Sequence, residues 1–452
     1  MARLGKSFPK SARVAELLSR RHFLQALLTT SAGLLAGCAA DSISLIATST
    51  PSPSPTPNPS VTPEATPLPR PTSTTTTTAT LSPTASAQPP LRTQTFSPTP
   101  TATASATPSP TATASPTPTP TTATPIKNVV IFVQENHTFD SLFAGFPDAD
   151  SEFAGQVCPE ALPADPPHQH GDALTPGGAT TEAARCSYTE ATAPNYWQIA
   201  REFSLCDRFF SDVRGPSHPN YLMLMAAQSP IVNTPWPTDL CPDFCLDIPT
   251  LPDRLDERGL TWRDYAGLFT SIKGLVGRPE ITLNDDASFF RDASDGTLPN
   301  VAWLNSAFLE EGYGKSGHPP AGLCVAENYA VDVLNAVMHG PQWNSTALFL
   351  VWDDWGGFFD HVEPPLVETW LDGTPFRYGF RVPCLVISPF ARRGYVSHEL
   401  HSLVSILRFT ETIFDLASLT ERDAQASTML DCFDFAQTPR PPLQFAPRDC
   451  SV

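Results

Sequence analysis

Two pairs of oxygen-bearing side chains directly follow apolar runs of the chain. Glu135-Asn136 follows the uncharged run 129–133, and Asp353-Asp354 follows the run 346–352. Carboxylate and amide oxygens are hard ligands that suit a divalent cation. Both pairs are therefore candidate metal ligands, although the first stretch alone is equally typical of a buried strand followed by an Asx turn.

A serine occupies a position that could support nucleophilic chemistry. Ser217 follows a Gly-Pro turn and precedes the strong helix formers 221–227. It is therefore expected at or near a helix N-terminus, where exposed amides and the positive end of the dipole favour a phosphate or a developing alkoxide. Taken alone, the pattern favours a serine that only caps the helix.

Three histidines are candidates for proton transfer, because imidazole titrates nearest to neutral pH. His318 lies in a rigid Gly-His-Pro-Pro loop, and His398 lies shortly after a third apolar run. Asp360 could orient the ring of His361, but packing against the neighbouring phenylalanines explains that pair equally well. One or more of these imidazoles could protonate a leaving oxygen.

The apolar runs predict the framework that holds these groups. Continuous apolar stretches without alternation are typical of parallel strands covered by helices on both faces. Such sheets bind ligands just beyond the carboxyl ends of their strands. The third run, 382–387, leads to Ser388 and then His398, so three strands are expected to end in polar groups at one sheet edge. Further helices are expected at 196–203, 251–258, 325–338 and 403–416, and further strands at 261–265 and 300–304.

Composition limits both the folded part and its partners. The 452 residues include 50 prolines that are concentrated in the first third, so one globular region remains. The formal net charge of -18 argues against nucleic acid as a partner, since phosphate-backbone binding needs a cationic surface. A site that handles phosphate in this acidic chain needs a local positive charge, which a metal would supply.

The first 38 residues resemble an export signal. Basic residues precede Arg20-Arg21, which is similar to a twin-arginine motif, and an apolar run too short to span a bilayer follows. The run ends in Leu-Ala-Gly before Cys38, as in a bacterial lipobox, so Cys38 is expected to carry a lipid. A plain secretory signal is the alternative. We expect an exported, extracytoplasmic protein, anchored to the cell membrane through Cys38.

Residues 39–125 are rich in Thr, Pro, Ser and Ala and contain almost nothing that could form a core. Fully extended at ~3.1 Å per residue, this disordered linker would reach ~270 Å. It is expected to tether a single catalytic domain, residues 126–452. Within that domain, residues 146–193 form a long loop region that carries His168 and His170, and loops of this length are often functional.

The cysteines of an exported domain can form disulfides. We expect Cys158–Cys186, Cys241–Cys245 and Cys432–Cys450 as possible pairs, because these residues lie in loop-like or terminal segments. The other three resemble small buried apolar residues; they are Cys206, Cys324 and Cys384.

Four blocks follow one another along the chain: Glu135–Asp140, Gly215–Pro219, Trp352–Val362 and Ser405–Phe409. In this order they resemble the bacterial phosphoesterase family of phosphatidylcholine-type phospholipases C and AcpA-like acid phosphatases. The resemblance covers essentially residues 126–440, although His137-Thr138 departs from the commoner family form and the regions 146–193 and 230–330 match weakly.

The resemblance implies an α/β fold of the alkaline-phosphatase type, a sandwich with a mostly parallel central sheet between helices. It implies one or more divalent metal ions of unknown identity, bound by Glu135, Asn136, Ser217, Asp353 and Asp354. It also implies histidines near the phosphate, which correspond to His318 and His398 and less surely to His170. His218, beside the serine, is a further expected substrate contact.

The residues and the resemblance agree on a mechanism. Ser217 would be activated by the metal and the helix N-terminus and would attack phosphorus to give a phosphoseryl intermediate. The expected function is that of a phospholipase C-like phosphodiesterase, with a phosphate ester or phospholipid as substrate. An acid phosphatase-type phosphomonoesterase is the alternative within enzymes, and an inactive, surface-tethered binding lipoprotein is the alternative from another class.

Overall fold

The computed structural model describes residues 124–234, 245–283, 285–305, 312–369 and 375–451, which belong to one compact unit, Pro118–Val452. The expected signal, nearly all of the expected linker, Cys38 and Cys241 lie outside these residues. None of the helices in the described ranges has the length and apolar character needed to cross a membrane.

A seven-stranded sheet with the order β10-β2-β9-β6-β1-β5-β4 forms the centre of this unit. The four strands from β6 to β4 are parallel to one another, whereas β9 runs antiparallel to both of its neighbours. The expected class, an α/β fold with a mostly parallel sheet between helices, is confirmed. The strands are β1 (Asn128–Gln134), β2 (Ser204–Cys206), β4 (Trp262–Asp264), β5 (Val301–Asn305), β6 (Thr346–Trp352), β9 (Cys384–Ile387) and β10 (Tyr395–Ser397).

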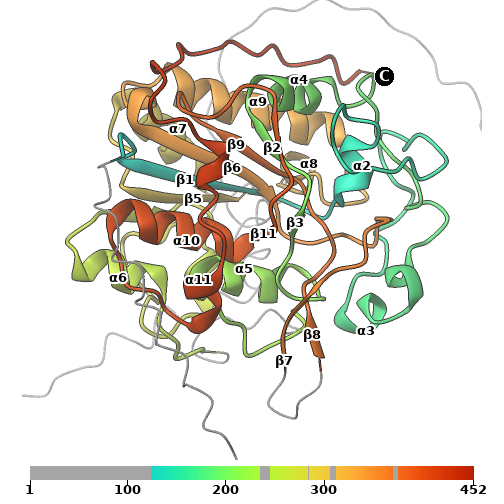
Figure 1. Cartoon of the computed structure of the whole chain (residues 1–452), viewed down its shortest axis with the longest axis horizontal. Coiled ribbons are helices and arrows are strands. Elements are labelled where there is room, and N and C mark those ends of the chain that lie inside the picture. Colours follow the sequence, from blue (N-terminus) through green and yellow to red (C-terminus); the bar gives the residue numbers. More distant parts are fainter. Residues whose placement is uncertain (1–123, 235–244, 284, 306–311, 370–374, 452) are drawn as a thin grey trace, which may run out of the picture. The chain divides into compact units, whose positions relative to one another are not determined.

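Helices cover both faces of this sheet (Figure 1). Phe349 of β6 packs on Phe409 of α10, with ring centroids 5.0 Å apart, and Trp352 of the same strand packs on Tyr196 of α4 at 5.2 Å. Positions 349 and 352 differ by an odd number, so they point to opposite faces of the strand. Helix α10 groups with α5 and α11 on one side, and α4 and α9 lie on the other. The helices are α4 (Pro194–Glu202), α5 (Ser217–Ala226), α6 (Leu251–Glu257), α7 (Asp286–Asp295), α9 (Leu323–His339), α10 (Leu403–Phe414) and α11 (Glu421–Gln425).

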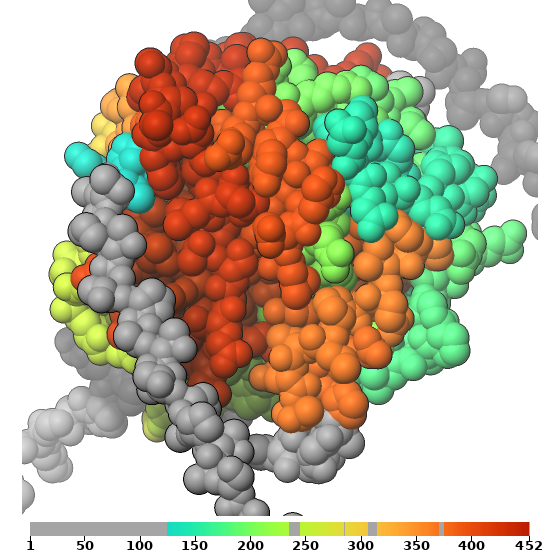
Figure 2. Space-filling model, in the orientation of Figure 1, coloured from blue at the N-terminus to red at the C-terminus, as the bar shows by residue number. Residues whose placement is uncertain are grey.

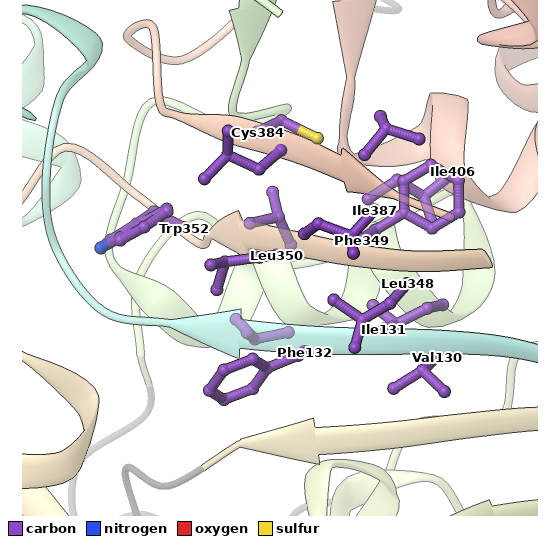
Figure 3. Packing of buried hydrophobic residues seen from close by; sticks show 14 of the residues in the cluster. Val130, Ile131, Phe132, Leu348, Phe349, Leu350, Trp352, Cys384, Ile387 and Ile406 are labelled. Atoms are coloured by element: carbon purple, nitrogen blue, oxygen red, sulfur yellow. The ribbon is translucent and has the colours of Figure 1, made fainter. Parts of the chain in front are cut away.

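The central strands are buried along their whole length, which explains their lack of alternation. All seven residues of β1 and all seven of β6 are buried, and they pair in parallel from Asn128 opposite Thr346 to Gln134 opposite Trp352. Figure 3 shows apolar side chains of both strands, among them Ile131, Phe132, Leu348 and Leu350. This parallel register brings the residues that follow β1 and β6 to the same edge of the sheet.

The expectation that the third apolar run ends at that edge was wrong. Strand β9 runs opposite to β6, as its arrow shows in Figure 3. The hydroxyl of Ser388, which follows β9, therefore donates a hydrogen bond to the carbonyl oxygen of Thr346, the first residue of β6, at 2.9 Å. Ser388 lies at the edge opposite the predicted site. Apolar composition identifies a buried strand but carries no information about its direction.

The remaining elements are short and lie around the sheet. Helix α2 (Phe139–Phe143) follows β1, and α3 (His170–Ala173) lies in the long loop. Residues of the last third of the chain form much of the face shown in Figure 2. The others are α8 (Gly312–Ser316), β3 (Phe209–Phe210), β7 (Leu366–Thr369), β8 (Pro375–Arg377), β11 (His401–Ser402), η3 (Pro176–Ala179), η4 (Leu268–Ser271), η5 (Trp343–Ser345) and η6 (Leu430–Cys432).

The disulfides match the sequence expectation only in part. Cys158–Cys186 is confirmed, and Cys245 is disulfide-bonded. Cys450, however, pairs with Cys324 rather than with Cys432. Cys324 lies in the first turn of α9. The C-terminal segment returns along this helix, where the Asn335 amide donates to the Phe445 carbonyl oxygen at 2.9 Å. Cysteine spacing could not reveal this long-range return of the chain.

Candidate active site

The candidate site lies at the carboxyl ends of three adjacent parallel strands. Glu135 and Asn136 follow β1, Asn305 ends β5, and Asp353 and Asp354 follow β6. All five side chains are buried. The sequence predicted the first and last pairs, and the parallel register of β1 and β6 brings them together.

A carboxylate links the two strand ends. One oxygen of Asp353, Oδ1, accepts hydrogen bonds from the backbone amides of Asn136 at 3.0 Å and of Asp354 at 2.8 Å. The Asp354 carboxylate accepts in turn from the amide of Gly356 at 2.7 Å. Because the donors are backbone amides, the positions of both carboxylates are fixed by the fold of the two turns and not by other side chains.

Ser217 is the first residue of α5, and its hydroxyl faces this carboxylate group. It donates to Glu135 Oε2 at 3.2 Å and to Asp354 Oδ2 at 3.4 Å. The turn before it is held by Asn220, whose amide donates to the carbonyl oxygens of Gly215 and Pro216. The expected position of Ser217 at a helix N-terminus is confirmed, and the hydroxyl does more than cap the helix.

Two groups that sequence reasoning missed position Glu135. Tyr221 lies one helical turn after Ser217, and its hydroxyl donates to Glu135 Oε1. Asn305 donates to the same oxygen at 3.2 Å and to the Tyr221 hydroxyl oxygen at 2.9 Å. The sequence did hold one indication for Tyr221. It follows Ser217 by four residues, and residues four apart share a helix face.

The site concentrates negative charge in three buried carboxylates, those of Glu135, Asp353 and Asp354. Burial, and then the Glu135 carboxylate, raises the pKa of Asp353 to about 8. Burial, followed by repulsion from Asp353, raises the pKa of Asp354 well above its usual range, and burial also raises that of Glu135. Three carboxylates in one buried cluster oppose ionisation of one another, so a bound cation would stabilise their charged forms.

The donor set fits a divalent cation. Asn136 Oδ1 and Asp353 Oδ2 are buried, and neither has a hydrogen-bond partner among the described residues. Together with Glu135, Asp354 and Ser217 they offer oxygen ligands only, which suits a hard metal such as Mg²⁺, Ca²⁺ or Mn²⁺ more than a soft one. Buried polar atoms are ordinarily hydrogen-bonded, so the two unpaired oxygens point to a missing ligand.

Beside Asn136 lies His168, which the sequence did not single out as a site residue, and next to His168 lies the predicted His318. The Asn136 side-chain amide lies 3.2 Å from His168 Nε2, and the rings of His168 and His318 are 5.7 Å apart. Asp165 offers a carboxylate to the same pair. His168 lies in the long loop that the sequence marked as functional, but its position beside Asn136 depends on the tertiary fold.

His361 and His398 make their contacts in a second polar cluster, built around buried Arg381. His361 Nδ1 lies 2.6 Å from Asp140 Oδ2, and Arg381 donates to Asp140 Oδ1 at 2.9 Å. The predicted Asp360–His361 pair is replaced by this Asp140 contact, while Asp360 accepts from Arg381 at 3.0 Å. Ser217 donates to Glu135 and Asp354 instead, so among the described residues neither His361 nor His398 is hydrogen-bonded to the serine.

His398 lies at the carboxyl end of β10, and its Nδ1 is 2.8 Å from Asp207 Oδ2, just after the parallel strand β2. Strand β2 is antiparallel to β9, which is antiparallel to β6. The end of β10 therefore points to the same side of the sheet as the ends of β1 and β6, but at its outer strand. The side chain of His398 is exposed.

The other candidate histidines flank the serine. His170 Nδ1 contacts the carbonyl oxygen of Arg214, just before the turn that presents Ser217. His218 Nε2 lies 3.3 Å from Ser271 Oγ, and burial lowers the pKa of His218 to about 4. His137, where the chain departs from the commoner family form, stacks on Phe358 at 4.6 Å and contacts the Glu135 carbonyl oxygen.

Comparisons with known proteins identify the family of this chain. Residues 169–417 match the model of the Phosphoesterase family. Phospholipase C B of Mycobacterium tuberculosis is 28% identical over 305 residues, which are 56% of this chain and 57% of the relative. Non-specific phospholipase C1 of Arabidopsis thaliana is 26% identical over 391 residues, 70% of this chain and 72% of the relative. The chain thus spans little more than half of the mycobacterial protein.

Solved structures give weaker likenesses, which concern the fold alone. Murine ectonucleotide pyrophosphatase/phosphodiesterase 5 is 10% identical, with a TM-score of 0.41 over 68% of this chain and 100% of that chain. A protein of the alkaline phosphatase superfamily from Vibrio parahaemolyticus is 13% identical, with a TM-score of 0.38 over 67% of this chain and 69% of that chain.

The family match covers more than half of the chain and includes Ser217, His318 and the Asp353-Asp354 pair. The chain belongs to the Phosphoesterase family.

Proposed function

We propose that this protein is a metal-dependent phosphoric ester hydrolase, a phospholipase C-like phosphodiesterase that uses Ser217 as its nucleophile. The observation that carries the proposal is the position of Ser217 Oγ, at the start of α5 and within 3.4 Å of two buried carboxylates. A hydroxyl there faces both a cluster suited to a metal and the amides of a helix N-terminus. This arrangement argues against the alternative of an inactive binding lipoprotein.

The proposed metal ligands are Glu135, Asn136, Ser217, Asp353 and Asp354. A divalent cation on these oxygens would favour the alkoxide form of Ser217 and offset charge on the phosphoryl oxygens. Tyr221 and Asn305 hold Glu135 in place, and the backbone amides that bond to Asp353 hold that carboxylate. The site is thus organised before substrate arrives, which is the property that makes electrostatic stabilisation effective.

In the proposed reaction, the Ser217 proton leaves towards Glu135 Oε2 or Asp354 Oδ2 as Oγ bonds to phosphorus and the bond to the leaving oxygen breaks. Water then hydrolyses the phosphoserine and regenerates the hydroxyl. His318 is the proposed donor of the proton to the leaving oxygen. Its Nδ1 lies 2.6 Å from the Pro319 carbonyl oxygen, so Nδ1 carries a proton and Nε2 is the nitrogen that would exchange one with the substrate.

The proposed substrate is a phosphodiester such as a phospholipid. The phospholipase C names of the mycobacterial and plant relatives support this choice over a monoester. The proposed location, outside the cytoplasm and on the membrane through a lipid at Cys38, rests on the sequence of residues 1–38. A membrane-tethered domain would meet such substrates at high local concentration.

The test is a panel of phosphodiester and phosphomonoester substrates, assayed before and after exhaustive chelation. We expect faster turnover of the diesters, loss of activity on chelation, and recovery with a divalent cation. Full activity after chelation would exclude metal dependence, and faster turnover of monoesters would favour the phosphatase alternative.

A variant pair separates loss of the metal from loss of the fold. Asp354→Asn should bind less metal and lose turnover. Asp264→Asn is the matched control, because Asp264 is also buried but its carboxylate accepts hydrogen bonds from the backbone amides of Ala266, Gly267 and Phe269 and is not itself one of the proposed metal ligands. It should lose stability while keeping its metal.

A further inference from the structure

A second cluster of metal-ligating side chains lies in the core, apart from the proposed active site. Cys206 at the end of β2, His401 in β11 and Cys432 in η6 are all buried. One ligand atom from each of the three lies within 4.8 Å of the others, and the sulfurs of Cys206 and Cys432 are 3.8 Å apart. The three elements are distant in sequence, so the fold itself creates this grouping.

A third thiol borders the cluster. Cys384, whose sulfur is visible at the start of β9 in Figure 3, is the direct antiparallel partner of Cys206. Directly opposed residues of two strands project to the same face of the sheet. Cys384 lies outside the group of three within 4.8 Å but adjoins it through Cys206. Sulfurs together with an imidazole are the ligand types of a tetrahedral zinc site.

The imidazole of His401 has one nitrogen held by polar groups and one without a hydrogen-bond partner among the described residues. His401 Nε2 lies 3.0 Å from Ser397 Oγ and 3.6 Å from Asp431 Oδ1. Its other nitrogen, Nδ1, is buried and has no hydrogen-bond partner within the described part of the chain. In metalloproteins a carboxylate commonly holds one nitrogen of the ring while the other binds the metal.

The state of the cysteines also needs explanation. In the same domain, Cys158–Cys186 and Cys324–Cys450 form disulfides. The thiols of Cys206, Cys384 and Cys432 are not disulfide-bonded. A single buried thiol is well explained as a small apolar residue. Three thiols around an imidazole with an unpaired buried nitrogen are not, because an unpaired polar atom in the core costs free energy.

We propose that Cys206, Cys432 and His401 bind a structural Zn²⁺, with Cys384 as the fourth ligand and Asp431 as the carboxylate that orients the imidazole. Each coordinating thiol loses its proton to solvent as the metal binds, and the imidazole binds in its neutral form. The metal would link strands β2 and β9 to the C-terminal residues 430–432. This site differs in chemistry from the oxygen-only active site, so the two would select different metals.

The test uses Co²⁺ as a spectroscopic substitute for zinc. The full chain is reduced, freed of metal under anaerobic conditions and titrated with Co²⁺. Thiolate-to-cobalt charge-transfer bands in the near ultraviolet, abolished by Zn²⁺, are expected from the proposed site. The active site cannot produce these bands because it has no sulfur ligand. Absence of the bands from the reduced, folded protein would overturn the proposal.

Two variants sharpen the result. Cys432→Ser should lose the bands and retain phosphoesterase activity at moderate temperature. Asp431→Asn keeps every ligand and should show the bands at saturating Co²⁺, but with zinc affinity reduced by about 10-fold to 100-fold. Unchanged zinc affinity in Asp431→Asn would show that Asp431 does not orient the imidazole of His401. The reduced wild-type titration decides the proposal if Cys432→Ser fails to fold.

Thiol counting provides an independent outcome. In a chain that carries Cys38→Ala, which removes the thiol expected to be lipidated, the denatured, metal-free protein should contain three reactive thiols besides the disulfides if zinc protects them in the native state; they are Cys206, Cys384 and Cys432. If the protein as purified instead contains a Cys206–Cys432 disulfide and no zinc, and reduction does not restore metal binding, the cluster is a redox pair and the proposal is wrong.

Discussion

Asn136 and Gly356 pack backbone against backbone, and both have a left-handed conformation, with φ of 62° and 58°. A Cβ atom added to Gly356 would lie 2.4 Å from the carbonyl oxygen of Asn136 and 2.6 Å from its Cβ. Such distances are far inside van der Waals contact, so the turn after β6 can approach the turn after β1 only because residue 356 is glycine. This contact limits how closely the two pairs of proposed metal ligands approach.

Gly356→Ala is therefore expected to displace Asn136 and lower kcat/KM by about 100-fold, the loss that a 1 Å misplacement of catalytic groups can cause. Gly259→Ala is the matched control, since Gly259 also has a positive φ of 67° but no atom within 4 Å of the added Cβ. It should lose a little stability and no activity. Equal losses of activity in both variants would show that backbone strain, rather than the contact with Asn136, is responsible.

Tyr221→Phe removes the hydroxyl that bonds to Glu135 Oε1. We expect metal affinity or kcat to fall by about 10-fold to 100-fold, as for other groups that orient a metal ligand. Tyr329→Phe is the control, because the Tyr329 hydroxyl is buried and has no hydrogen-bond partner among the residues described. Isothermal titration with Mn²⁺, together with kinetics at saturating metal, separates the two effects. Wild-type metal affinity and kcat in Tyr221→Phe would show that Asn305 alone is enough to position Glu135.

Glu411 on α10 predicts a dependence of stability on pH. Burial, and then its contact with the Asp423 carboxylate, raises the pKa of Glu411 to about 8 in the folded protein, against an ordinary value of 4.5. Between these values the folded protein holds a proton that the unfolded chain releases, so the free energy of unfolding falls as pH rises through this window. Glu411→Gln should reduce this loss and be more stable than wild type near pH 8, by on the order of 1 kcal/mol after solvent screening.

Denaturant unfolding at several pH values between 5 and 8 measures the effect of Glu411→Gln. Glu399→Gln, at an exposed position, is the control and should follow the wild-type curve. If the free energy of unfolding changes with pH equally in wild type and Glu411→Gln, Glu411 is charged in the folded state.

Cys38→Ala tests the anchor. If Cys38 carries a lipid, as the preceding Leu-Ala-Gly suggests, this change should release the protein from membranes, because it removes the acceptor thiol. Cell fractionation with a high-salt wash is the measurement. Persistence of the variant in the membrane pellet would show that something other than a lipid on Cys38 holds it there.

The parts of the site that sequence could reveal are those fixed by local pattern. Glu135 and Asp353 follow continuous apolar runs, and burial on both faces of a parallel strand is what removes alternation from such runs. Ser217 follows a Gly-Pro turn and precedes helix formers, which places it at a helix start. In each case the information lies within about ten residues.

The parts that sequence could not reveal depend on tertiary contacts. The reversed direction of β9 is set by its neighbours β6 and β2, and it moved Ser388 to the far edge. His168 and Asn305 join the site through segments that are distant in the chain. Tyr221 lies in a run of helix formers, where nothing local distinguishes a tyrosine that packs from one that bonds to a carboxylate.

The central prediction names one atom: Ser217 Oγ becomes phosphorylated during turnover. Ser217→Ala leaves only water to attack phosphorus, so the rate should fall on the order of 10⁴-fold or more. Ser217→Thr keeps an attacking oxygen and should retain part of the activity. His218→Ala, at the next position of α5, is a control for disturbance of the helix start and should keep the phosphoserine.

Acid quench during turnover, followed by peptide mass mapping, should find phosphate on the peptide that contains Ser217. The hydrogen bonds of its hydroxyl to Glu135 and Asp354 provide two acceptors for the proton that it must lose, and a serine that only capped α5 would need neither. Phosphate on a histidine, or wild-type rates in Ser217→Ala, would contradict the assignment. Those outcomes would indicate a phosphohistidine intermediate or direct attack by water, respectively, with the same carboxylates holding the metal.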